Sequence, residues 1–265
     1  MKIKYCIPSY HRADSIGEKT LKYVPEALVF VSPDDYDDYV RYNPKYKENI
    51  IKCPEGIQGT PDGKGKCKTM NYILDTEMTD DDTCVLFMDD DITCLMRKVH
   101  DGKDEIVSPD EFKELCEGYC LLAREWGCGM WSYNLNCDPL MYREFLPFCL
   151  HAYTTGAIQA FVRKDDLRFD TRFSMKEDID MCLQQMQRYH KVLRVNRYYF
   201  RVRAFTGKGG VHEFRSIERE KEQFKMFQKK WGTDIVRPNK PTGMKASKIK
   251  EYNGAVKINV PLSGS

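Results

Sequence analysis

The chain has 265 residues and a mass of 31.0 kDa, enough for one substantial α/β domain or two small ones. Charged residues make up 31% of the sequence and hydrophobic residues 42%, which excludes a disordered or a fibrous protein. The apolar runs span only a handful of residues, far short of the roughly 20 that cross a bilayer, so we expect no contact with a membrane. Because no apolar leader opens the chain, we expect a cytoplasmic protein, in the host cytoplasm if it is viral.

Strand and helix patterns alternate along the chain. The expected strands cover residues 2–9, 27–31, 49–53, 83–88, 130–135, 157–163 and 192–200. The expected helices cover residues 15–24, 35–43, 66–77, 109–126, 174–189 and 218–231. This alternation predicts an α/β fold, with a mostly parallel central sheet, helices on both of its faces, and ligands at the carboxyl ends of the strands. No linker is evident, so we expect one domain over residues 1–231 and a basic tail or extension over 232–265.

Charge is unevenly distributed between the two parts of the chain. Residues 201–265 hold 15 Lys and Arg against 6 Asp and Glu, whereas residues 1–200 hold 27 against 34. A basic final third suits a phosphate-rich partner, and equally suits a solvated helix. The eleven cysteines are odd in number and include no C-x-x-C motif, so we expect reduced, mostly buried thiols.

Three consecutive carboxylates, Asp89, Asp90 and Asp91, directly follow the apolar run 83–88. Such a concentration of like charge at the end of a buried strand favours a bound divalent cation. A second triplet, Asp80–Asp82, has no strand before it, and we interpret it as a plain turn. A further metal ligand should come from elsewhere, and His212 is the candidate because it follows the flexible segment 207–210.

The glycine-rich loop 56–65 leads into the expected helix 66–77. It is not a P-loop, because the G-x-x-x-x-G-K-[ST] spacing is absent. Lys64, Lys66 and Lys68 are placed to meet a diphosphate at the start of this helix, although a solvated basic loop is nearly as good an explanation.

Two carboxylates open the amphipathic helix expected over 174–189. Glu177 stands three residues after Ser174, a capping-box pattern, so we expect it to cap the helix by contacting the Ser174 backbone N–H. Asp178 has no such role and is the candidate general base, while Asp180 is expected to solvate the helix face or to favour the helix dipole.

In this order the motifs resemble those of the GT-A family of nucleotide-sugar-dependent glycosyltransferases. The resemblance spans about residues 1–215 and rests on four segments: Ile7-Pro8-Ser9-Tyr10-His11-Arg12, Phe87-Met88-Asp89-Asp90-Asp91, Lys176-Glu177-Asp178-Ile179-Asp180 and Val211-His212-Glu213. It implies the Rossmann-like GT-A fold and a sugar-transfer activity.

The resemblance also implies roles for individual residues. The donor nucleotide would contact Pro8, Ser9, Tyr10 and Arg12, with Asp34 and Asp90 as further contacts. Asp89 and Asp91 would bind Mn²⁺ or Mg²⁺ at the diphosphate, with His212 completing the metal shell. Asp178 would be the base of an inverting transfer. The family usually has arginine on the helix after the third strand, whereas this chain has Lys66 and Lys68, so the diphosphate contact departs from the family pattern.

The implied donor is a nucleotide sugar, a UDP-sugar in our prediction. The basic final third is similar to phage-type enzymes that glycosylate hydroxymethylated pyrimidines in DNA, which predicts DNA binding through residues 215–250, with Trp231 or a nearby aromatic against a base. A sugar-nucleotide pyrophosphorylase would be expected to have a glycine-rich signature after the first strand, where this chain has Pro8-Ser9-Tyr10. Two alternatives stay open: a metal-dependent nuclease and a non-catalytic nucleic-acid-binding protein.

Overall fold

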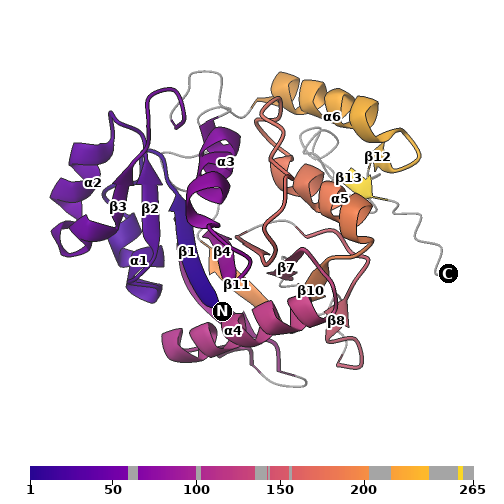
Figure 1. The fold of residues 1–265 in the computed structure, drawn as a ribbon, viewed down its shortest axis with the longest axis horizontal. Helices are drawn as coiled ribbons and strands as arrows, with labels where there is room; N and C mark the ends of the chain where they lie inside the picture. The colour runs from indigo at the N-terminus through magenta and orange to yellow at the C-terminus, as the bar shows by residue number, and fades with distance from the viewer. Residues whose placement is uncertain are drawn as a thin grey trace.

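The computed structural model describes residues 1–58, 65–99, 103–134, 142, 144–154, 157–202, 216–238 and 256–258. Its centre is an eight-stranded sheet in the order β3-β2-β1-β4-β9-β7-β10-β8 (Figure 1). The strands of this sheet are β1 (Lys2–Pro8), β2 (Leu28–Val31), β3 (Ile50–Lys52), β4 (Thr83–Met88), β7 (Met130–Tyr133), β8 (Phe148–Cys149), β9 (Ile158–Phe161) and β10 (Leu193–Val195). Four of the seven strand pairings are parallel, namely β3–β2, β2–β1, β1–β4 and β7–β10. The mostly parallel sheet is therefore confirmed.

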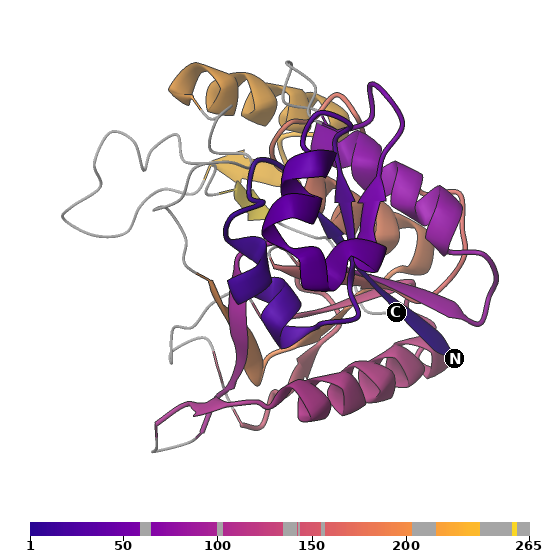
Figure 2. The ribbon, with the colours of Figure 1, turned by 90° about the vertical axis from the view of Figure 1, so that its left-hand side faces the viewer.

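Helices cover both faces of this sheet, also as expected. The helices are α1 (Thr20–Tyr23), α2 (Tyr36–Tyr42), α3 (Gly65–Glu77), α4 (Pro109–Glu125), α5 (Glu177–Tyr189) and α6 (Ile217–Trp231), with 3₁₀ turns at Ile16–Glu18 and Pro44–Asn49. Helices α1, α2 and α4 contribute to one hydrophobic core, and α3, α5 and α6 to another. Accordingly, α4 and α6 lie on opposite sides of the molecule (Figure 2).

Strand β4 shows why the sheet needs both cores. Its side chains alternate, with Leu86 and Met88 in the core of α1, α2 and α4, and Val85 and Phe87 in the core of α3, α5 and α6. All six residues of β4 are buried, as the continuous apolar run predicted. The architecture is that of a Rossmann-like GT-A fold, and it places the end of β4 in the middle of the sheet.

A second sheet, in the order β11-β5-β6, was not expected from the sequence. It consists of β5 (Ile92–Arg97), β6 (Glu105–Ile106) and β11 (Tyr198–Val202). The single strand expected over 192–200 was wrong, because the chain leaves the large sheet after β10 and pairs with β5 from Tyr198 onward. Asn196 stabilises this break, since its backbone N–H donates to the Pro147 carbonyl at 2.8 Å and its Nδ2 to the Leu146 carbonyl at 2.9 Å.

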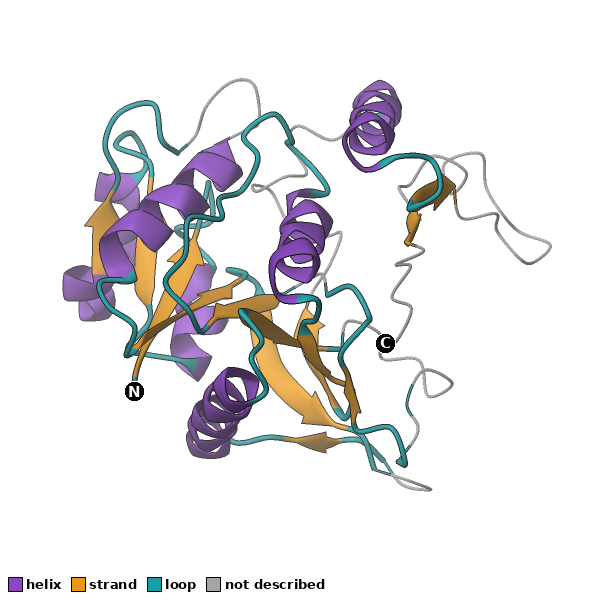
Figure 3. Cartoon of the chain, turned by 45° about the vertical axis from the view of Figure 1, so that its right-hand side comes forward, coloured by secondary structure: helices purple, strands orange, loops and turns teal. Residues whose placement is uncertain are grey.

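Helix α6 is followed by a small ribbon of β12 (Val236–Pro238) and β13 (Val256–Ile258), visible beside the helix in Figure 3. Val236 is buried in the same core as Phe227 of α6. The division into a domain over 1–231 and a tail over 232–265 stays a prediction.

All ten cysteines in the described ranges are free thiols, nine of them buried, as expected; Cys137 lies outside these ranges. Among the described residues, no helix combines the length and the apolar character that spanning a membrane requires.

Candidate active site

The chain turns sharply where β4 ends at the three carboxylates. The Asp89 backbone N–H donates to the Ala157 carbonyl at 3.0 Å, which ties this turn to the start of β9. The Thr20 hydroxyl donates to the Asp89 carbonyl at 2.8 Å and accepts from the Ile92 N–H at 3.0 Å. Because both sides of the turn are held, consecutive carboxylates emerge at the carboxyl edge of the sheet.

The other Asp triplet behaves differently. The Asp80 side chain accepts from the Asp82 N–H at 3.0 Å and from the Thr83 hydroxyl at 2.7 Å, while Asp81 and Asp82 are exposed. This is a hydrogen-bonded turn, as predicted, and it lies at the opposite end of β4.

The loop after β1 binds the middle carboxylate of the first triplet. The Ser9 hydroxyl donates to Asp90 Oδ2 at 2.7 Å and therefore accepts from the Tyr39 hydroxyl at 2.6 Å. Tyr39 in turn accepts from the Arg12 backbone N–H at 3.0 Å. Gln58 also positions this loop, because its Nε2 donates to the Ser9 carbonyl at 3.0 Å.

The Arg12 guanidinium, itself buried, bridges two carboxylates. Its Nε lies 3.4 Å from Asp90 Oδ1, and its Nη1 lies 3.2 Å from Asp91 Oδ2. Burial raises the pKa of Asp90 above its ordinary value, and Arg12 and Ser9 oppose that rise. Arg12 thus compensates Asp90 and Asp91 together.

Lys66, in the first turn of α3, connects Asp89 to the next cluster. Its Nζ lies 3.0 Å from Glu177 Oε1 and 3.8 Å from Asp89 Oδ1. Loss of hydration in this concave site raises the pKa of Asp89 to about 6; Lys66 opposes the rise, and the Asp91 and Asp90 charges add to it. The Asp89 side chain nevertheless keeps 41% of its surface exposed, so it is the carboxylate of the triplet most open to a ligand.

The segment before α5 differs from the helix and cap expected there. The helix begins at Glu177 and not at Ser174, and Lys176 precedes it in the left-handed conformation, with φ of 69°. The predicted capping box is wrong, since the Ser174 N–H donates to Gln223 Oε1 at 3.0 Å and the Glu177 carboxylate contacts Lys66. The tertiary contact of Glu177 with a cation outweighs the local cap.

Lys66, Asp89 and Glu177 line a small pocket at the carboxyl end of β4. Its lining includes Pro8 of β1, Lys66 of α3, Gln159 of β9, Asp178 of α5, and Asp89, which directly follows β4. Asp178 is partly exposed there, its Oδ1 accepts from the Ile179 N–H at 2.8 Å, and its backbone carbonyl accepts from Gln159 Nε2 at 3.3 Å. The predicted base, the predicted diphosphate lysine and the predicted metal ligand Asp89 therefore share one site.

Comparison with known families matches residues 3–211 to the model of the TET-associated glycosyltransferases. The chain belongs to this family. It is a glycosyltransferase of the DNA-modifying type, whose family implies a nucleotide-sugar donor and a DNA acceptor in general terms. No curated protein matches the chain.

Tyr10, Asp34 and Lys68, also predicted for this glycosyltransferase site, are outside the lining of the pocket. Tyr10 stacks on His11, with ring centroids 3.7 Å apart. Asp34 is exposed, whereas its neighbour Asp35 contacts His11. Lys68 Nζ donates to the Gly56 carbonyl at 3.4 Å, on the loop that follows β3. His212 lies outside the described residues.

Sequence reasoning missed several residues of the glycosyltransferase site. Glu177 was assigned to a helix cap, and Tyr39, Asp35 and Gln159 had no assigned role. An acidic residue beside a candidate base is a signal that could have indicated Glu177. Nothing local distinguishes Tyr39 or Gln159, because each reaches the site only through the packing of its helix or strand.

Asp180 also differs from the expectation of a solvated residue. Its side chain is fully buried and accepts from Gln184, Lys230 and Trp231. Asp180 is buried because α6 covers this face of α5.

Proposed function

We propose that this glycosyltransferase moves a sugar from a UDP-sugar to the hydroxyl of a hydroxymethylated pyrimidine in DNA, with a divalent cation and with inversion at the anomeric carbon. The observation that carries the proposal is the pocket shared by Asp89, Lys66 and Asp178 at the end of β4. A cation site, a basic group for a leaving phosphate and a carboxylate base are the three parts that such a transfer needs.

The balance of charge around the pocket fits a bound cation. Asp89, Asp90, Asp91 and Glu177 are four carboxylates, and the cations paired with them are Arg12 and Lys66. Loss of hydration is the main cause of the raised pKa of Asp89, and the neighbouring charges of Asp91 and Asp90 add to the rise in spite of Lys66, so a bound cation would find favourable negative charge there.

In the described ranges no three His, Cys, Asp or Glu side chains converge on one metal position. Asp89 and Asp91 would therefore hold Mn²⁺ or Mg²⁺ together with donor phosphate oxygens and, in our prediction, His212. When bound, the ion supplies positive charge to the diphosphate as it leaves. Lys66 serves the same leaving group from the start of α3, where the helix dipole also favours an anion.

The loop after β1 supports a role in holding the nucleoside of the donor. Ser9, Arg12 and Asp90 form one hydrogen-bonded unit whose geometry Tyr39 fixes from α2. Pro8 lines the pocket, and the Tyr10–His11 stack offers an aromatic surface on the loop that follows it. We assign this loop to binding of the donor nucleoside, and Asp34, after β2, to a further contact with it.

Asp178 is the proposed general base. It would accept the proton of the acceptor hydroxyl while that oxygen attacks the anomeric carbon from the side opposite the diphosphate. Glu177 is committed to Lys66 at 3.0 Å, which leaves Asp178 as the α5 carboxylate of the pocket that is partly exposed.

Helix α6 supports a role in DNA binding. Lys221, Lys225 and Lys229 are exposed and recur every four residues, so they follow one another along the outer side of the helix; we call them the α6 lysine row. A row of this kind suits contacts with successive phosphates. Within a duplex, the target base would have to leave the stack to reach the pocket.

Thermal unfolding tests the donor and metal assignment. We expect UDP to raise the Tm only when Mn²⁺ is present, by on the order of 5 to 10 °C at 100 times the Kd. Asp89→Ala should abolish the shift. The exposed Asp81→Ala, from the other Asp triplet, is the matched control and should keep it.

Transfer itself is tested by mass spectrometry of hydroxymethylated and unmodified DNA incubated with UDP-sugars and Mn²⁺. The expected result is the mass of one sugar per modified base, with unmodified DNA unchanged. Equal labelling of both DNAs, or Mn²⁺-dependent cleavage of DNA without a donor, would refute the assignment.

A further inference from the structure

Helix α6 lies outside the family match, which ends at residue 211. It nevertheless makes hydrogen bonds and an ion pair with the segment just before Glu177 and Asp178. Lys176 Nζ donates to Glu220 Oε2 at 2.6 Å, and the two side chains keep only 6% and 4% of their surface exposed. Beside this pair, Gln223 accepts the Ser174 backbone N–H at 3.0 Å. The first turns of α6 therefore hold both Ser174 and Lys176.

Lys176 has an unusual backbone conformation at the position just before Glu177 and Asp178. Its φ of 69° and ψ of 13° lie in the left-handed region, which residues with a Cβ atom disfavour and glycine adopts freely. The backbone at Lys176 sets the direction in which α5 departs. A change there would redirect Glu177 and Asp178 away from Lys66 and the pocket.

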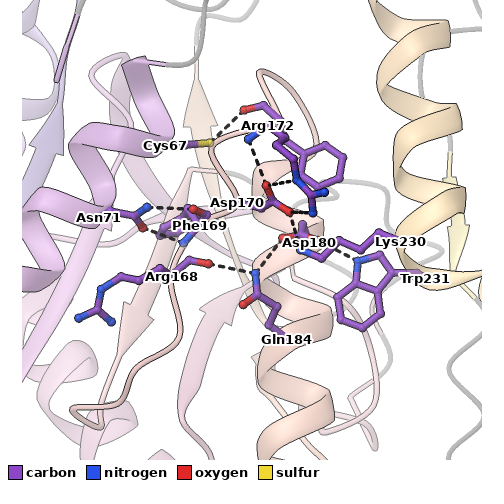
Figure 4. A network of polar contacts seen from close by, with 11 residues as sticks. Cys67, Asn71, Arg168, Phe169, Asp170, Arg172, Asp180, Gln184, Lys230 and Trp231 are labelled. Atoms are coloured by element: carbon purple, nitrogen blue, oxygen red, sulfur yellow. Dashed lines mark hydrogen bonds and ion pairs between the residues drawn. The ribbon is translucent and has the colours of Figure 1, made fainter. Parts of the chain in front are cut away.

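The far end of α6 contacts the first turn of α5 itself. Lys230 Nζ contacts Asp180 and Asp170, and the Trp231 indole N–H donates to Asp180 Oδ1 at 2.8 Å (Figure 4). Asp180 is two residues after Asp178 and fully buried. The beginning of α5 is thus held by polar contacts with both ends of α6.

We propose that Glu220 is a positioning residue for the transfer: its buried ion pair keeps Lys176 left-handed and so aims Asp178 into the pocket. This inference rests on the proposed function, in which Asp178 takes the acceptor proton. It also makes α6, which carries the α6 lysine row, a part of the catalytic architecture. Contact with DNA and placement of the base would then depend on one helix.

The backbone claim can be separated from a general loss of stability. Glu220→Gln alone leaves a buried ammonium without its charged partner, which destabilises the fold whatever its role. We therefore compare two double variants, Lys176→Gly with Glu220→Gln and Lys176→Ala with Glu220→Gln. Both remove the ion pair and the buried ammonium, and they differ only in how readily residue 176 becomes left-handed.

Both variants are assayed on hydroxymethylated DNA at a temperature below that at which either begins to unfold. The glycine double variant should have a kcat about tenfold above that of the alanine double variant. The difference reflects the fraction of molecules in which residue 176 is left-handed. The KM for the donor and the Kd for UDP should agree within about twofold, because neither variant touches the nucleoside loop. Equal kcat values for the two variants would overturn the inference.

Glu222→Gln is the matched control, since it makes the same chemical change at an exposed position of the same helix and should keep the wild-type kcat. Glu220→Gln should lower kcat without changing the KM for the donor, and a wild-type kcat in that variant also overturns the inference. If the wild type transfers no sugar, or Asp178→Asn keeps its rate, the proposed function fails instead. The two failures are therefore distinguishable.

Discussion

Lys66 is the residue at which the electrostatics of the site can be tested most directly. Its ammonium lies between Glu177 and Asp89, and it is the chief influence that opposes the raised pKa of Asp89. Lys66→Met keeps most of the length of the side chain and removes the charge. Among the described residues, Arg12 is then the remaining cation paired with the carboxylates around the pocket, and the pKa of Asp89 should rise further.

The size of that rise follows from the 3.8 Å between Lys66 Nζ and Asp89 Oδ1. At this distance two unit charges interact by about 1 kcal/mol in water and about 4 kcal/mol at an effective dielectric constant of 20. Because 41% of the Asp89 side chain is exposed, the lower figure applies. It corresponds to roughly 0.7 pKa units, which moves the pKa of Asp89 from about 6 to nearly 7.

Binding provides the measurement. A proton and a cation compete for Asp89, so Mn²⁺-dependent UDP binding should weaken as the pH falls through the pKa of Asp89. Calorimetric titrations between pH 5 and 8 should place the midpoint of this loss roughly 0.7 units higher in Lys66→Met than in the wild type.

Lys68→Met is the matched control, because Lys68 is on the same helix and contacts the Gly56 carbonyl instead of the carboxylates. It should keep the wild-type midpoint. A midpoint that does not move in Lys66→Met, or that moves equally in Lys68→Met, would refute the assignment of Lys66 as the partner of Asp89.

Asp178→Asn should retain UDP binding and lower kcat by roughly 10² to 10⁴, as expected when a general base is removed; a rate near that of the wild type would assign the base elsewhere. Hydrogen bonds from Arg172 and Lys230 hold the pKa of Asp170 well below its ordinary value, so Asp170 stabilises the fold above about pH 4, and this contribution is lost as the pH falls further. The free energy of urea unfolding should therefore decline less steeply below pH 4 in Asp170→Asn, and parallel curves for variant and wild type would contradict this. Replacing the α6 lysine row by alanine should reduce the slope of log Kd for DNA against log salt by roughly 3, whereas an unchanged slope would place the DNA on another surface.

Much of the fold follows from patterns within short stretches. The apolar run of β4, whose side chains alternate between the two cores, depends on neighbouring residues alone. So does the cap of α4, in which Ser108 Oγ accepts from the Glu111 N–H at 3.2 Å. For the same reason, the two Asp triplets could be told apart, because only one of them follows a buried strand.

Contacts between distant residues decided the rest. β11 pairs with β5 about a hundred residues earlier, and nothing in the sequence of either strand indicates this pairing. Glu177 has the spacing of a helix cap and yet contacts Lys66, more than a hundred residues away, because an ion pair in a partly enclosed site outweighs a local hydrogen bond.

The sequence by itself determined the strand ends at which charge gathers, since like charges beside an apolar run are visible without coordinates. Only the tertiary structure decided which cation meets which carboxylate, and that the left-handed Lys176 is held by Glu220 of α6. The physical reason is that side-chain electrostatics act over a few ångströms in space, whatever the separation along the chain.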